Sequence, residues 1–497
     1  MRLEDIIRNA GAVEVRGNRC LDITDICNDS REVTPGAVFI AVKGHEIDGH
    51  DFIGKAIGSG AAAIVYENEE ALPSAVSEHP DSRLTFVKVR DSRHAMAMMA
   101  ADFFDNPSKK LTLVRITGTN GKTTTVTLLY RLFMSQGYNC GLLSTIANYV
   151  GTKRLETNNT TADPITINRL MSEMADAGCE FCFMEVSSIG VEQERVTGLE
   201  FKVGIFSNLT HDHLDYHKTF AEYLRCKKMF FDNLPATATA ITNIDDKNGE
   251  VMVQNTKAKV VRYSCKKMAD HTCRIMEETF EGMLLKIDGH ETWTRLIGQH
   301  NAYNILAVYC TAIVAGADPE ETLVAISRLE SAPGRLEVLR GPRHLSVVID
   351  YAHTPDALEN VLETLRDIDN GKELVCLFGC GGDRDRTKRP EMAAIAERYA
   401  DRIIVTSDNS RTERTEDILE DIRKGFSSKG LAKTIFIADR KEAIRASIMF
   451  AKDGAVILLA GKGHETYQII GTEHRHFDER EIVAEVFGEI NVKEEQR

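Results

Sequence analysis

The sequence lacks any uninterrupted run of about 18 apolar residues, the length that a helix needs to cross a bilayer. Residues 1–10 include acidic side chains and no long apolar core, so they do not have the pattern of a secretory signal peptide. There is no excess of positive charge, because 61 Lys and Arg stand against 75 Asp and Glu, for a net charge of -14. An acidic chain is a poor general binder of nucleic acid or anionic membranes. We therefore expect a cytoplasmic protein with no nucleic-acid or membrane partner.

The sequence also lacks the signs of a disulfide framework. Its 11 cysteines are odd in number and scattered, and a chain of 497 residues does not need disulfides to hold a core. Cys179 and Cys182 form the single CxxC pair, which leads into an apolar run. We interpret them as buried strand cysteines rather than as a redox pair or metal ligands. Internal repeats are absent, and the one biased segment is the short charged C-terminus.

The length predicts about three domains of ~150 residues each. Two breaks divide the chain, one at Asp105-Asn106-Pro107-Ser108 and one at Pro333-Gly334. A helix that includes residues 96–104 is expected to link the first two units. We predict a small N-terminal domain over residues 1–98, a central domain over 99–332 and a C-terminal domain over 333–497.

Apolar runs of strand length alternate with helical patterns in the second and third units, which is typical of mostly parallel sheets with helices on both faces. The predicted fold class is therefore α/β, with a small α/β N-terminal domain, a doubly wound central sheet and a Rossmann-like C-terminal domain. The expected strands are 37–42 and 61–66, then 111–116, 140–143, 181–186, 203–206 and 240–244, then 346–349, 374–378, 403–406, 434–438 and 456–460. Helices are expected near 126–133 and from Pro355, Pro390, Glu416 and Lys441.

A glycine-containing loop follows the strand expected at 111–116. Glycines let the backbone approach a phosphate, Lys122 supplies a positive charge, and Thr123 can place its hydroxyl on Mg²⁺. The usual pattern would place a first glycine at position 116, where this chain has Ile116, so the loop is a shorter variant. An ordinary glycine turn is the alternative. The predicted ATP-binding residues of the loop are Gly118, Thr119, Asn120, Gly121, Lys122, Thr123 and Thr124.

Three further features of the central unit can be read in two ways. Glu185 ends an apolar strand, where a carboxylate can bind a metal or can simply be solvated. The Asp/His cluster at 212–217 can bind a metal, orient water or form polar surface; histidine is an unusual ligand for Mg²⁺. Lys227 lies in a helical pattern, and by itself it reads as a solvent-exposed lysine.

Four polar clusters of the C-terminal unit each follow a predicted strand, so they are expected to converge on one crevice. They are residues 350–355, 379–386, 408–411 and 461–465. Arginine binds carboxylates and carboxylates bind ammonium groups, so this combination suits a zwitterionic ligand. The alternative is a set of ordinary helix caps and loops.

With these motifs in place, the sequence resembles the Mur ligases of peptidoglycan synthesis over nearly its whole length, and most closely the diaminopimelate-adding members. The supporting motifs are Asp29-Ser30-Arg31, residues 117–124, Glu185-Val186-Ser187-Ser188, residues 212–217, Gly298-Gln299-His300-Asn301, Pro333-Gly334-Arg335-Leu336-Glu337, residues 350–355 and residues 461–465. The resemblance implies a monomeric, ATP-dependent ligase that joins a carboxylate to an amine through an acyl phosphate. The implied substrates are UDP-N-acetylmuramoyl-L-Ala-D-Glu, ATP and meso-diaminopimelate.

The resemblance also implies roles for individual residues. Lys122, Glu185, His213 and Lys227 would be catalytic. Thr123, Glu185, His213 and Lys227 would serve Mg²⁺, with Lys227 carbamylated by CO₂. Asn301, Arg335, Asp350 and His353 would complete the ATP site. The UDP-sugar and its peptide would be held by Asn28, Ser30, His45, Asn159, Thr160, Thr161, Ser187, Gln193 and Arg195.

Diaminopimelate would bind Arg384, Asp408, Asn409, Ser410, Arg411, Gly461 and Glu465. Ser410 replaces a proline that these enzymes usually have, and Ile189 replaces a histidine. Arg411 would bind the distal carboxylate of diaminopimelate, a group that L-lysine lacks. The alternatives are an L-lysine-adding version of the ligase, a folylpolyglutamate- or cyanophycin-type ligase, which would have no use for a UDP-sugar domain, and a nucleotide-dependent switch without ligation.

Overall fold

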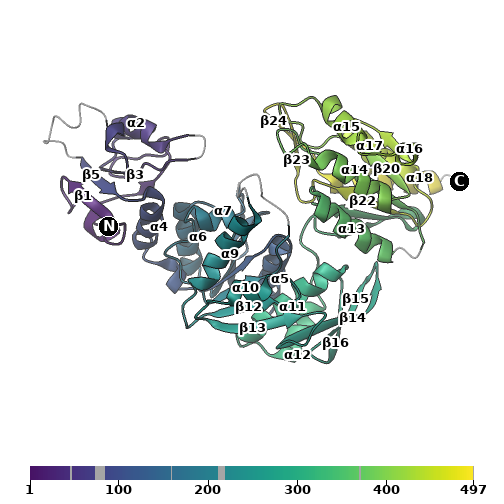
Figure 1. Ribbon diagram of the computed structural model, residues 1–497, viewed down its shortest axis with the longest axis horizontal. Helices are drawn as coiled ribbons and strands as arrows, with labels where there is room; N and C mark the ends of the chain where they lie inside the picture. Colours follow the sequence, from purple (N-terminus) through teal and green to yellow (C-terminus); the bar gives the residue numbers. More distant parts are fainter. Residues whose placement is uncertain (45–46, 73–83, 158, 211–218, 369–370, 496–497) are drawn as a thin grey trace.

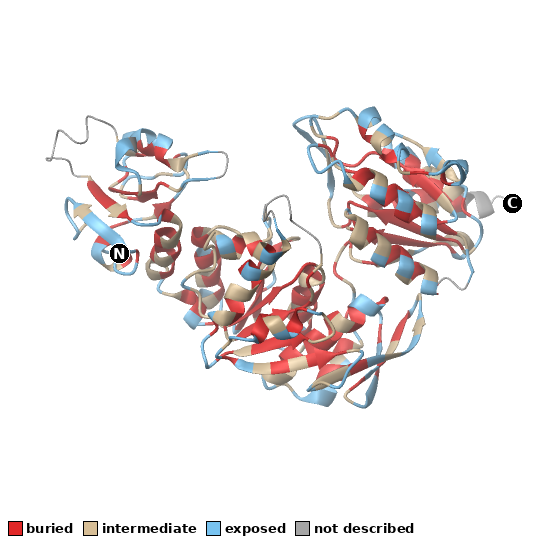
Figure 2. Ribbon diagram, viewed as in Figure 1, coloured by how far each residue is buried: buried red, intermediate tan, exposed pale blue. Residues whose placement is uncertain are grey.

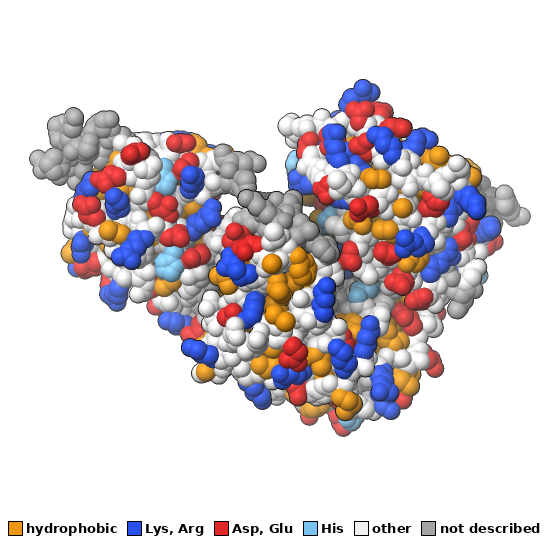
Figure 3. All heavy atoms as spheres, viewed as in Figure 1, with side chains coloured by type: hydrophobic (Ala, Val, Ile, Leu, Met, Phe, Trp, Pro, Cys, Tyr) orange, Lys and Arg blue, Asp and Glu red, His pale blue; other side chains and the backbone are white. Residues whose placement is uncertain are grey.

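The computed structural model describes residues 1–44, 47–72, 84–157, 159–210, 219–368 and 371–495. Three sheets of five or more strands follow one another along the chain, and a two-stranded sheet follows the third. The N-terminal and C-terminal sheets lie on either side of the central one, and the two outer parts stand apart from each other (Figure 1). The inner strands of the two larger sheets are buried between helices whose outer faces are exposed (Figure 2). On the face drawn in Figure 3, Lys and Arg side chains are interspersed with Asp and Glu.

The N-terminal part is a five-stranded sheet in the order β1-β5-β4-β3-β2. Strands β2 to β5 are parallel, and β1 joins β5 in the antiparallel sense. Helix α4 leaves this sheet, capped by Asp91, which accepts hydrogen bonds from two backbone N–H groups of the first turn. It packs on α6 of the central part and runs without a break past residue 98. The elements are α1 (Leu3–Ile6), β1 (Ala12–Arg16), β2 (Ile26–Cys27), β3 (Val38–Ile40), α2 (Ile53–Gly58), β4 (Ala63–Tyr66), β5 (Thr85–Val89) and α4 (Ser92–Phe103).

The central sheet has 11 strands in the order β16-β15-β14-β13-β12-β11-β6-β10-β7-β8-β9. Every neighbouring pair from β14 to β7 is parallel. Alternate residues of its strands enter two separate cores, Leu113 on one face and Val114 on the other. Helices α5, α11 and α12 cover one face, and α6, α9 and α10 cover the other. The antiparallel strands at the two edges were not expected, because their short amphipathic runs resemble loops.

The elements of the central part are β6 (Thr112–Thr117), α5 (Lys122–Ser135), β7 (Cys140–Leu143), β8 (Asn148–Val150), β9 (Lys153–Leu155), α6 (Pro164–Asp176), β10 (Phe181–Glu185), α7 (Ser188–Glu192), β11 (Val203–Phe206), α9 (Phe220–Asp232), β12 (Thr239–Asn243), α10 (Gly249–Val253), β13 (Lys259–Ser264), β14 (His271–Thr279), β15 (Gly282–Ile287), β16 (His290–Thr294), α11 (Gln299–Val314) and α12 (Pro319–Ile326).

The C-terminal part is a six-stranded sheet in the order β17-β18-β22-β19-β20-β21, parallel except for β17. Helices α13, α14 and α15 pack on one face, and α17 and α18 pack on the other. The elements are β17 (Glu337–Arg340), β18 (Ser346–Asp350), α13 (Pro355–Ile368), β19 (Leu374–Phe378), α14 (Lys388–Tyr399), β20 (Arg402–Val405), α15 (Thr415–Arg423), α16 (Ser428–Ala432), β21 (Thr434–Phe436), α17 (Arg440–Met449), β22 (Val456–Ala460), β23 (Tyr467–Ile470), β24 (Glu473–His476) and α18 (Glu479–Glu495).

The three-part α/β architecture predicted from the sequence is confirmed. The boundaries at 98/99 and 332/333 stay predictions. Cys182 is buried within β10, as expected for a strand cysteine, and Cys179 is buried too but lies two residues before the strand begins. In the part of the chain that the structure describes, no helix combines the length and the apolar character needed to cross a membrane.

Candidate active site

A cavity of about 690 Å³ lies where the central sheet meets the C-terminal part. Its wall is formed by the loop between β6 and α5, by the ends of β10 and β11, and by the first residues of α11 and α13. All the residues predicted to bind ATP line it: Gly118, Thr119, Asn120, Gly121, Lys122, Thr123, Thr124, Asn301, Arg335, Asp350 and His353. Residues more than 200 positions apart in the sequence therefore share one wall.

The loop between β6 and α5, residues 118–121, is called the phosphate loop because of its predicted role, and it needs glycine at two positions. A Cβ atom on Gly118 would lie 1.9 Å from Ser207 Oγ, and one on Gly121 would lie 2.4 Å from Asn304 Oδ1. Gly121 also has φ 87°, a conformation that strains other residues, and it stands immediately before α5. The backbone can thus turn tightly and direct the first N–H groups of α5 toward an anion.

Lys122 folds back onto its own loop. Its Nζ donates hydrogen bonds to Gly118 O at 2.9 Å and to Thr119 O at 2.7 Å. Both acceptors are neutral carbonyls, which a phosphate oxygen can replace with a gain in charge pairing. Asn208, which the sequence reasoning missed, braces the loop by accepting from Asn120 N through its Oδ1 at 2.9 Å. The sequence signal that could have identified Asn208 is its position just after β11, the parallel neighbour of β6.

Glu185 is fully buried and is not a solvated strand end. Its Oε2 accepts from Thr123 Oγ1 at 3.0 Å and from Thr145 Oγ1 at 3.1 Å, and its Oε1 accepts from Thr145 N at 2.8 Å. The strand end is therefore joined to the phosphate loop by a carboxylate and hydroxyl pair. Oxygen groups of this kind suit Mg²⁺. The fourth predicted metal residue, His213, lies in 211–218, outside the described residues.

Lys227 is 1% exposed, so its reading as a solvent-exposed helix lysine was wrong. It lies on α9, whose buried face turns it toward the sheet. Its Nζ donates to Gly118 O at 2.9 Å and to Thr117 Oγ1 at 3.4 Å, and it lies 4.7 Å from the centre of the Tyr223 ring. The helix periodicity of the sequence could have indicated this inward direction. What Nζ meets depends on the position of α9 over β6.

Most residues predicted to hold the peptide of the UDP-linked substrate lie beside Glu185. Arg195 donates through Nη1 to Thr161 O at 2.6 Å and through Nη2 to Gln193 Oε1 at 2.7 Å. Thr161 Oγ1 in turn accepts from Ser187 N at 3.0 Å. The residues of this set that line the cavity are Asn159, Thr160, Thr161, Ser187 and Arg195. Ile189, which stands in place of an expected histidine, lines it too.

On the C-terminal side of the cavity, Asp350 ends β18 and is buried. Burial raises its pKa above the usual value, and the charge of Arg335 and two backbone N–H groups oppose that rise. Its Oδ2 accepts from Leu336 N at 2.7 Å, and its Oδ1 accepts from Ala352 N at 2.8 Å. The guanidinium carbon of Arg335 lies 4.6 Å from the centre of the Tyr351 ring, which adds a flat cationic and aromatic surface to this wall.

One contact across the cavity was not foreseen from the sequence. Asn120 Nδ2, on the phosphate loop, donates to Asp356 Oδ2 at 3.1 Å. Thr210 Oγ1 donates to the same oxygen at 3.3 Å. Asp356 belongs to the first turn of α13, so a single carboxylate joins the C-terminal part to the phosphate loop.

Three family models match the chain in order along its length. Residues 22–104 match "Mur ligase family, catalytic domain", residues 116–312 match "Mur ligase middle domain", and residues 334–463 match "Mur ligase, glutamate ligase domain". The chain belongs to the Mur ligase family. The expected family is thereby confirmed, and the phosphate loop and both sides of the cavity lie within the matched residues.

This Mur ligase is similar to named enzymes over nearly its whole length. It is 47% identical to the UDP-N-acetylmuramoyl-L-alanyl-D-glutamate–2,6-diaminopimelate ligase of Cytophaga hutchinsonii, over 98% of this chain and 99% of that protein. It is 48% identical to the enzyme of the same name from Phocaeicola vulgatus, again over 98% of this chain and 99% of that protein. A solved structure of a UDP-N-acetylmuramoyl-L-alanyl-D-glutamate–2,6-diaminopimelate ligase matches with a TM-score of 0.70 and 30% identity, covering 99% of both chains.

The residues predicted to bind the amine substrate of this Mur ligase do not line the cavity. Most of them meet in a separate network at the carboxyl ends of β19, β20 and β22, where Asn409 Nδ2 donates to Glu465 Oε2 at 2.9 Å. Arg411 has φ 50° and donates through Nη1 to Gly382 O at 2.9 Å. Arg384 is exposed, and its Nη1 donates to Asp383 O at 3.1 Å. The members of the predicted set are Arg384, Asp408, Asn409, Ser410, Arg411, Gly461 and Glu465.

The residues predicted to hold the UDP-sugar lie in the N-terminal part. Asn28 is exposed and Ser30 is buried, just after β2. Between them Asp29 pairs with Arg31 at 2.6 Å, and the hydrogen bond from Arg31 lowers the pKa of Asp29 to about 2. His45 falls in 45–46, outside the described residues. None of the described members of this group lines the cavity.

Proposed function

We propose that this Mur ligase joins meso-diaminopimelate to the γ-carboxylate of D-Glu in UDP-N-acetylmuramoyl-L-Ala-D-Glu, with ATP as the energy source, in peptidoglycan precursor synthesis. The observation that carries the proposal is identity of 47–48% to ligases of that name over 98% of the chain. The match extends through all three parts of the chain. The cavity beside the phosphate loop supports the nucleotide-dependent step.

In the first step the D-Glu carboxylate attacks the γ-phosphate of ATP, and the products are an acyl phosphate and ADP. Phosphoryl transfer depends mainly on positioning and on stabilising spread negative charge. Lys122 Nζ and the N–H groups at the start of α5 supply that stabilisation. Arg195, Thr161 and Ser187 hold the peptide end of the substrate so that its carboxylate faces the loop.

Mg²⁺ fits the oxygen groups of Thr123 and Glu185, whose Oγ1 and Oε2 are 3.0 Å apart at the cavity wall. These residues, with His213, would hold it. The ion would supply positive charge that neutralises the transferring phosphoryl group. Glu185 is already aligned by Thr145, so little rearrangement is needed to present its oxygens.

Lys227 fits the carbamylation that we propose for it, because its Nζ is buried at the cavity wall beside the phosphate loop. The uncharged amine would attack CO₂ and lose a proton, which turns a cation into an anionic oxygen ligand. The intact mass of the protein, measured in bicarbonate buffer before and after acidification, tests this. The loss of one CO₂ is expected from the unchanged protein and not from Lys227→Ala.

In the second step an amino group of diaminopimelate attacks the acyl phosphate, and inorganic phosphate leaves the tetrahedral intermediate. We assign the distal carboxylate to Arg411 and the zwitterionic end to Asp408, Asn409 and Glu465. L-Lysine lacks the distal carboxylate, so Arg411 favours diaminopimelate. Because the amine residues lie outside the cavity, the C-terminal part must move toward the central sheet before the second step.

Phosphate release from ATP with UDP-N-acetylmuramoyl-L-Ala-D-Glu tests the proposal. Release is expected with meso-diaminopimelate and not with L-lysine or without an amine. Release with L-lysine alone would reassign the amine, and release that ignores any amine would point to a switch. Failure to bind UDP would favour a folylpolyglutamate- or cyanophycin-type ligase.

We further propose that the protein works as a monomer in the cytoplasm. All 11 cysteines are free in the structure, which suits a reducing compartment. The measured mass from light scattering during size exclusion tests the monomer, with a dimer as the contradicting result.

A further inference from the structure

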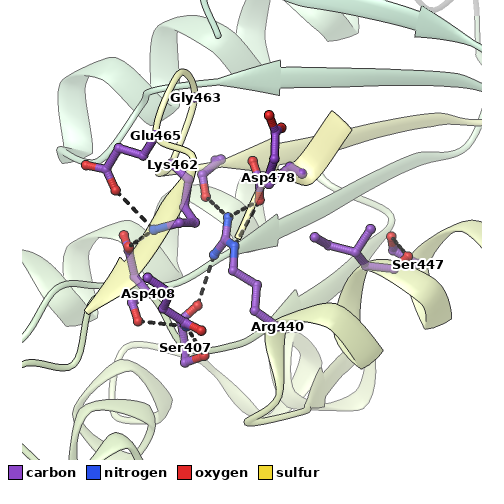
Figure 4. A network of polar contacts seen from close by, with 12 residues as sticks. Ser407, Asp408, Arg440, Ser447, Lys462, Gly463, Glu465 and Asp478 are labelled. Carbon is purple, nitrogen blue, oxygen red and sulfur yellow. Dashed lines mark hydrogen bonds and ion pairs between the residues drawn. The ribbon is translucent and has the colours of Figure 1, made fainter. Parts of the chain in front are cut away.

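Lys462 stands two residues after the end of strand β22 and is fully buried. A lysine ammonium loses most of its hydration when it is buried, so it persists there only with strong acceptors around it. Lys462 belongs to none of the residue sets proposed to bind ATP, Mg²⁺, the UDP-linked peptide or the amine. Figure 4 shows its side chain directed toward Asp408 and Glu465, at the end of the sheet where the amine residues lie.

Three acceptors surround the ammonium group. Lys462 Nζ donates to Glu465 Oε2 at 3.0 Å and to Asn409 Oδ1 at 3.1 Å, and it lies 3.6 Å from Asp408 Oδ1. An ammonium has three hydrogens, so each can be directed at one of these groups. All three acceptors belong to the set proposed to bind the amine substrate.

The contacts of Asn409 determine which way its amide points. Oδ1 accepts from Lys462 Nζ and from Ile469 N at 2.9 Å, both of which are donors. Nδ2 is therefore directed at Glu465 Oε2, 2.9 Å away. Without Lys462, one of the two donors that orient the amide is lost, and Glu465 loses the nearest charge that opposes its own.

The charges of the group match a substrate with one ammonium at this end. Asp408 and Glu465 carry two negative charges and Lys462 carries one positive charge, which leaves one negative charge. Burial alone would raise the pKa of Asp408, but the charges of Lys462 and Arg440 outweigh it and hold that pKa below its usual value.

A second buried cation supports the backbone beneath this group. Arg440 pairs with Glu479, with neither side chain exposed, and donates to Ser407 O at 3.1 Å and to Ala460 O at 2.8 Å. Ser407 immediately precedes Asp408, and Ala460 stands two residues before Lys462. Figure 4 shows the side chain of Arg440 directed toward Ser407. The scaffold is therefore held by Arg440, and Lys462 is left to act on the side chains.

We infer that Lys462 is a positioning residue of the amine-binding site: it orients Asn409 and Glu465 toward the zwitterionic end of the amine substrate without touching that substrate. Its side chain is fully buried, whereas those of Asp408 and Glu465 are 9% and 12% exposed. The inference rests on the proposed function, because it specifies how that function's amine site is built.

The test replaces Lys462 by Met, which removes the charge and keeps the length of the side chain. The KM for meso-diaminopimelate should rise about 10- to 100-fold, the range expected when a buried charged acceptor loses its donor. The KM for ATP should stay within about twofold, because the cavity is not touched. Formation of the acyl phosphate is measured without amine, by isotope scrambling between bridging and non-bridging oxygens of ATP, and should proceed at the normal rate.

Two further variants complete the design. Lys441→Met is the matched control, because Lys441 lies on α17 of the same part, is half-exposed and pairs with Glu485 at 2.9 Å. It should behave as the unchanged protein. Lys462→Gln keeps a donor for Asn409 and Glu465 while losing the charge, so it serves if Lys462→Met does not fold. It should also raise the KM for the amine.

The outcomes separate the inference from the proposed function. If the unchanged protein shows no amine-dependent phosphate release, the proposed function and this inference both fall. If it does, and the KM for diaminopimelate is unchanged in the folded Lys462 variants, only the inference falls. If isotope scrambling slows by the same factor as the KM for diaminopimelate rises, Lys462 has a merely structural role, and the inference is overturned.

Discussion

Two polar regions of this Mur ligase hold their charged side chains in different ways. In the cavity, the hydrogen bonds described for Lys122 go to neutral carbonyls of its own loop, around about 690 Å³ of space. In the C-terminal network, Lys462 is enclosed by Asn409, Glu465 and Asp408, with its charge already opposed. The first arrangement places a positive charge on the wall of the cavity, where a phosphate would bind. The second fixes the orientation of groups that must recognise an ammonium and a carboxylate together.

The largest expected effect comes from the cavity. Lys122→Ala should lower both acyl-phosphate formation and turnover by at least about 10²–10³-fold, because stabilisation of the transferring phosphoryl group is lost. Phosphate release and isotope scrambling in ATP measure the two. The control is Lys110→Ala, an exposed lysine of the same part that pairs with Asp105. Normal scrambling in Lys122→Ala would contradict the assignment of the phosphate loop.

Glu185→Gln should have the second largest effect. The amide keeps an oxygen for Thr123 or Thr145 but loses the charge that we assign to Mg²⁺. We expect the Mg²⁺ concentration for half-maximal turnover to rise about tenfold, with little change in the KM for diaminopimelate. A titration of turnover against Mg²⁺ measures this. An unchanged midpoint would remove Glu185 from the metal site.

Arg411→Ala tests the C-terminal network. It should raise the KM for meso-diaminopimelate about 10-fold or more and leave the KM for ATP nearly unchanged, because a charge-assisted contact to the distal carboxylate is lost. It should also narrow the preference over L-lysine. Arg414→Ala is the control, as Arg414 is exposed and follows in the same loop. Equal changes in both KM values would contradict separate sites.

Asp356→Ala tests the contact between the two parts. Its carboxylate accepts from Asn120 Nδ2 at 3.1 Å, so it places negative charge beside the loop that must receive phosphates. Removing it should tighten the binding of a non-hydrolysable ATP analogue by about two- to fivefold, the size of a partly screened charge interaction. Calorimetric titration measures the affinity. Weaker binding would show that the contact helps to form the nucleotide site.

Ser410→Pro should have the smallest effect. The N–H of Ser410 donates no hydrogen bond to any described residue, so proline removes no partner. We expect the KM for diaminopimelate to change by less than about twofold and the melting temperature to rise slightly, through lower entropy of the unfolded chain. A large rise in KM would show that this chain has adapted the turn to serine.

Much of the fold was predictable because its signals are local. The runs at 140–143, 203–206, 374–378 and 456–460 became strands with the expected bounds, since central strands of parallel sheets are buried on both faces. Strands β8, β9 and β13 to β16, toward the two ends of the central sheet, were not predicted. The two edge strands, β9 and β16, are largely exposed, and exposed strands carry weaker patterns. The phosphate loop was predictable from glycine and lysine spacing alone.

The sequence by itself determined the family, the three-part α/β architecture and the place of the glycine-containing loop between a strand and a helix, because these depend on local spacing and on motifs matched along the chain. Only the tertiary structure decided which way the lysines face. Lys227 is buried because α9 lies over the central sheet, and Lys462 is buried because Asp408 and Asn409, which follow β20, reach its ammonium group across the end of the sheet. The tertiary structure also brings Asn120 into contact with Asp356, 236 positions away, and no local pattern encodes that contact. Such contacts depend on how separate elements pack, and that packing is a property of the whole chain.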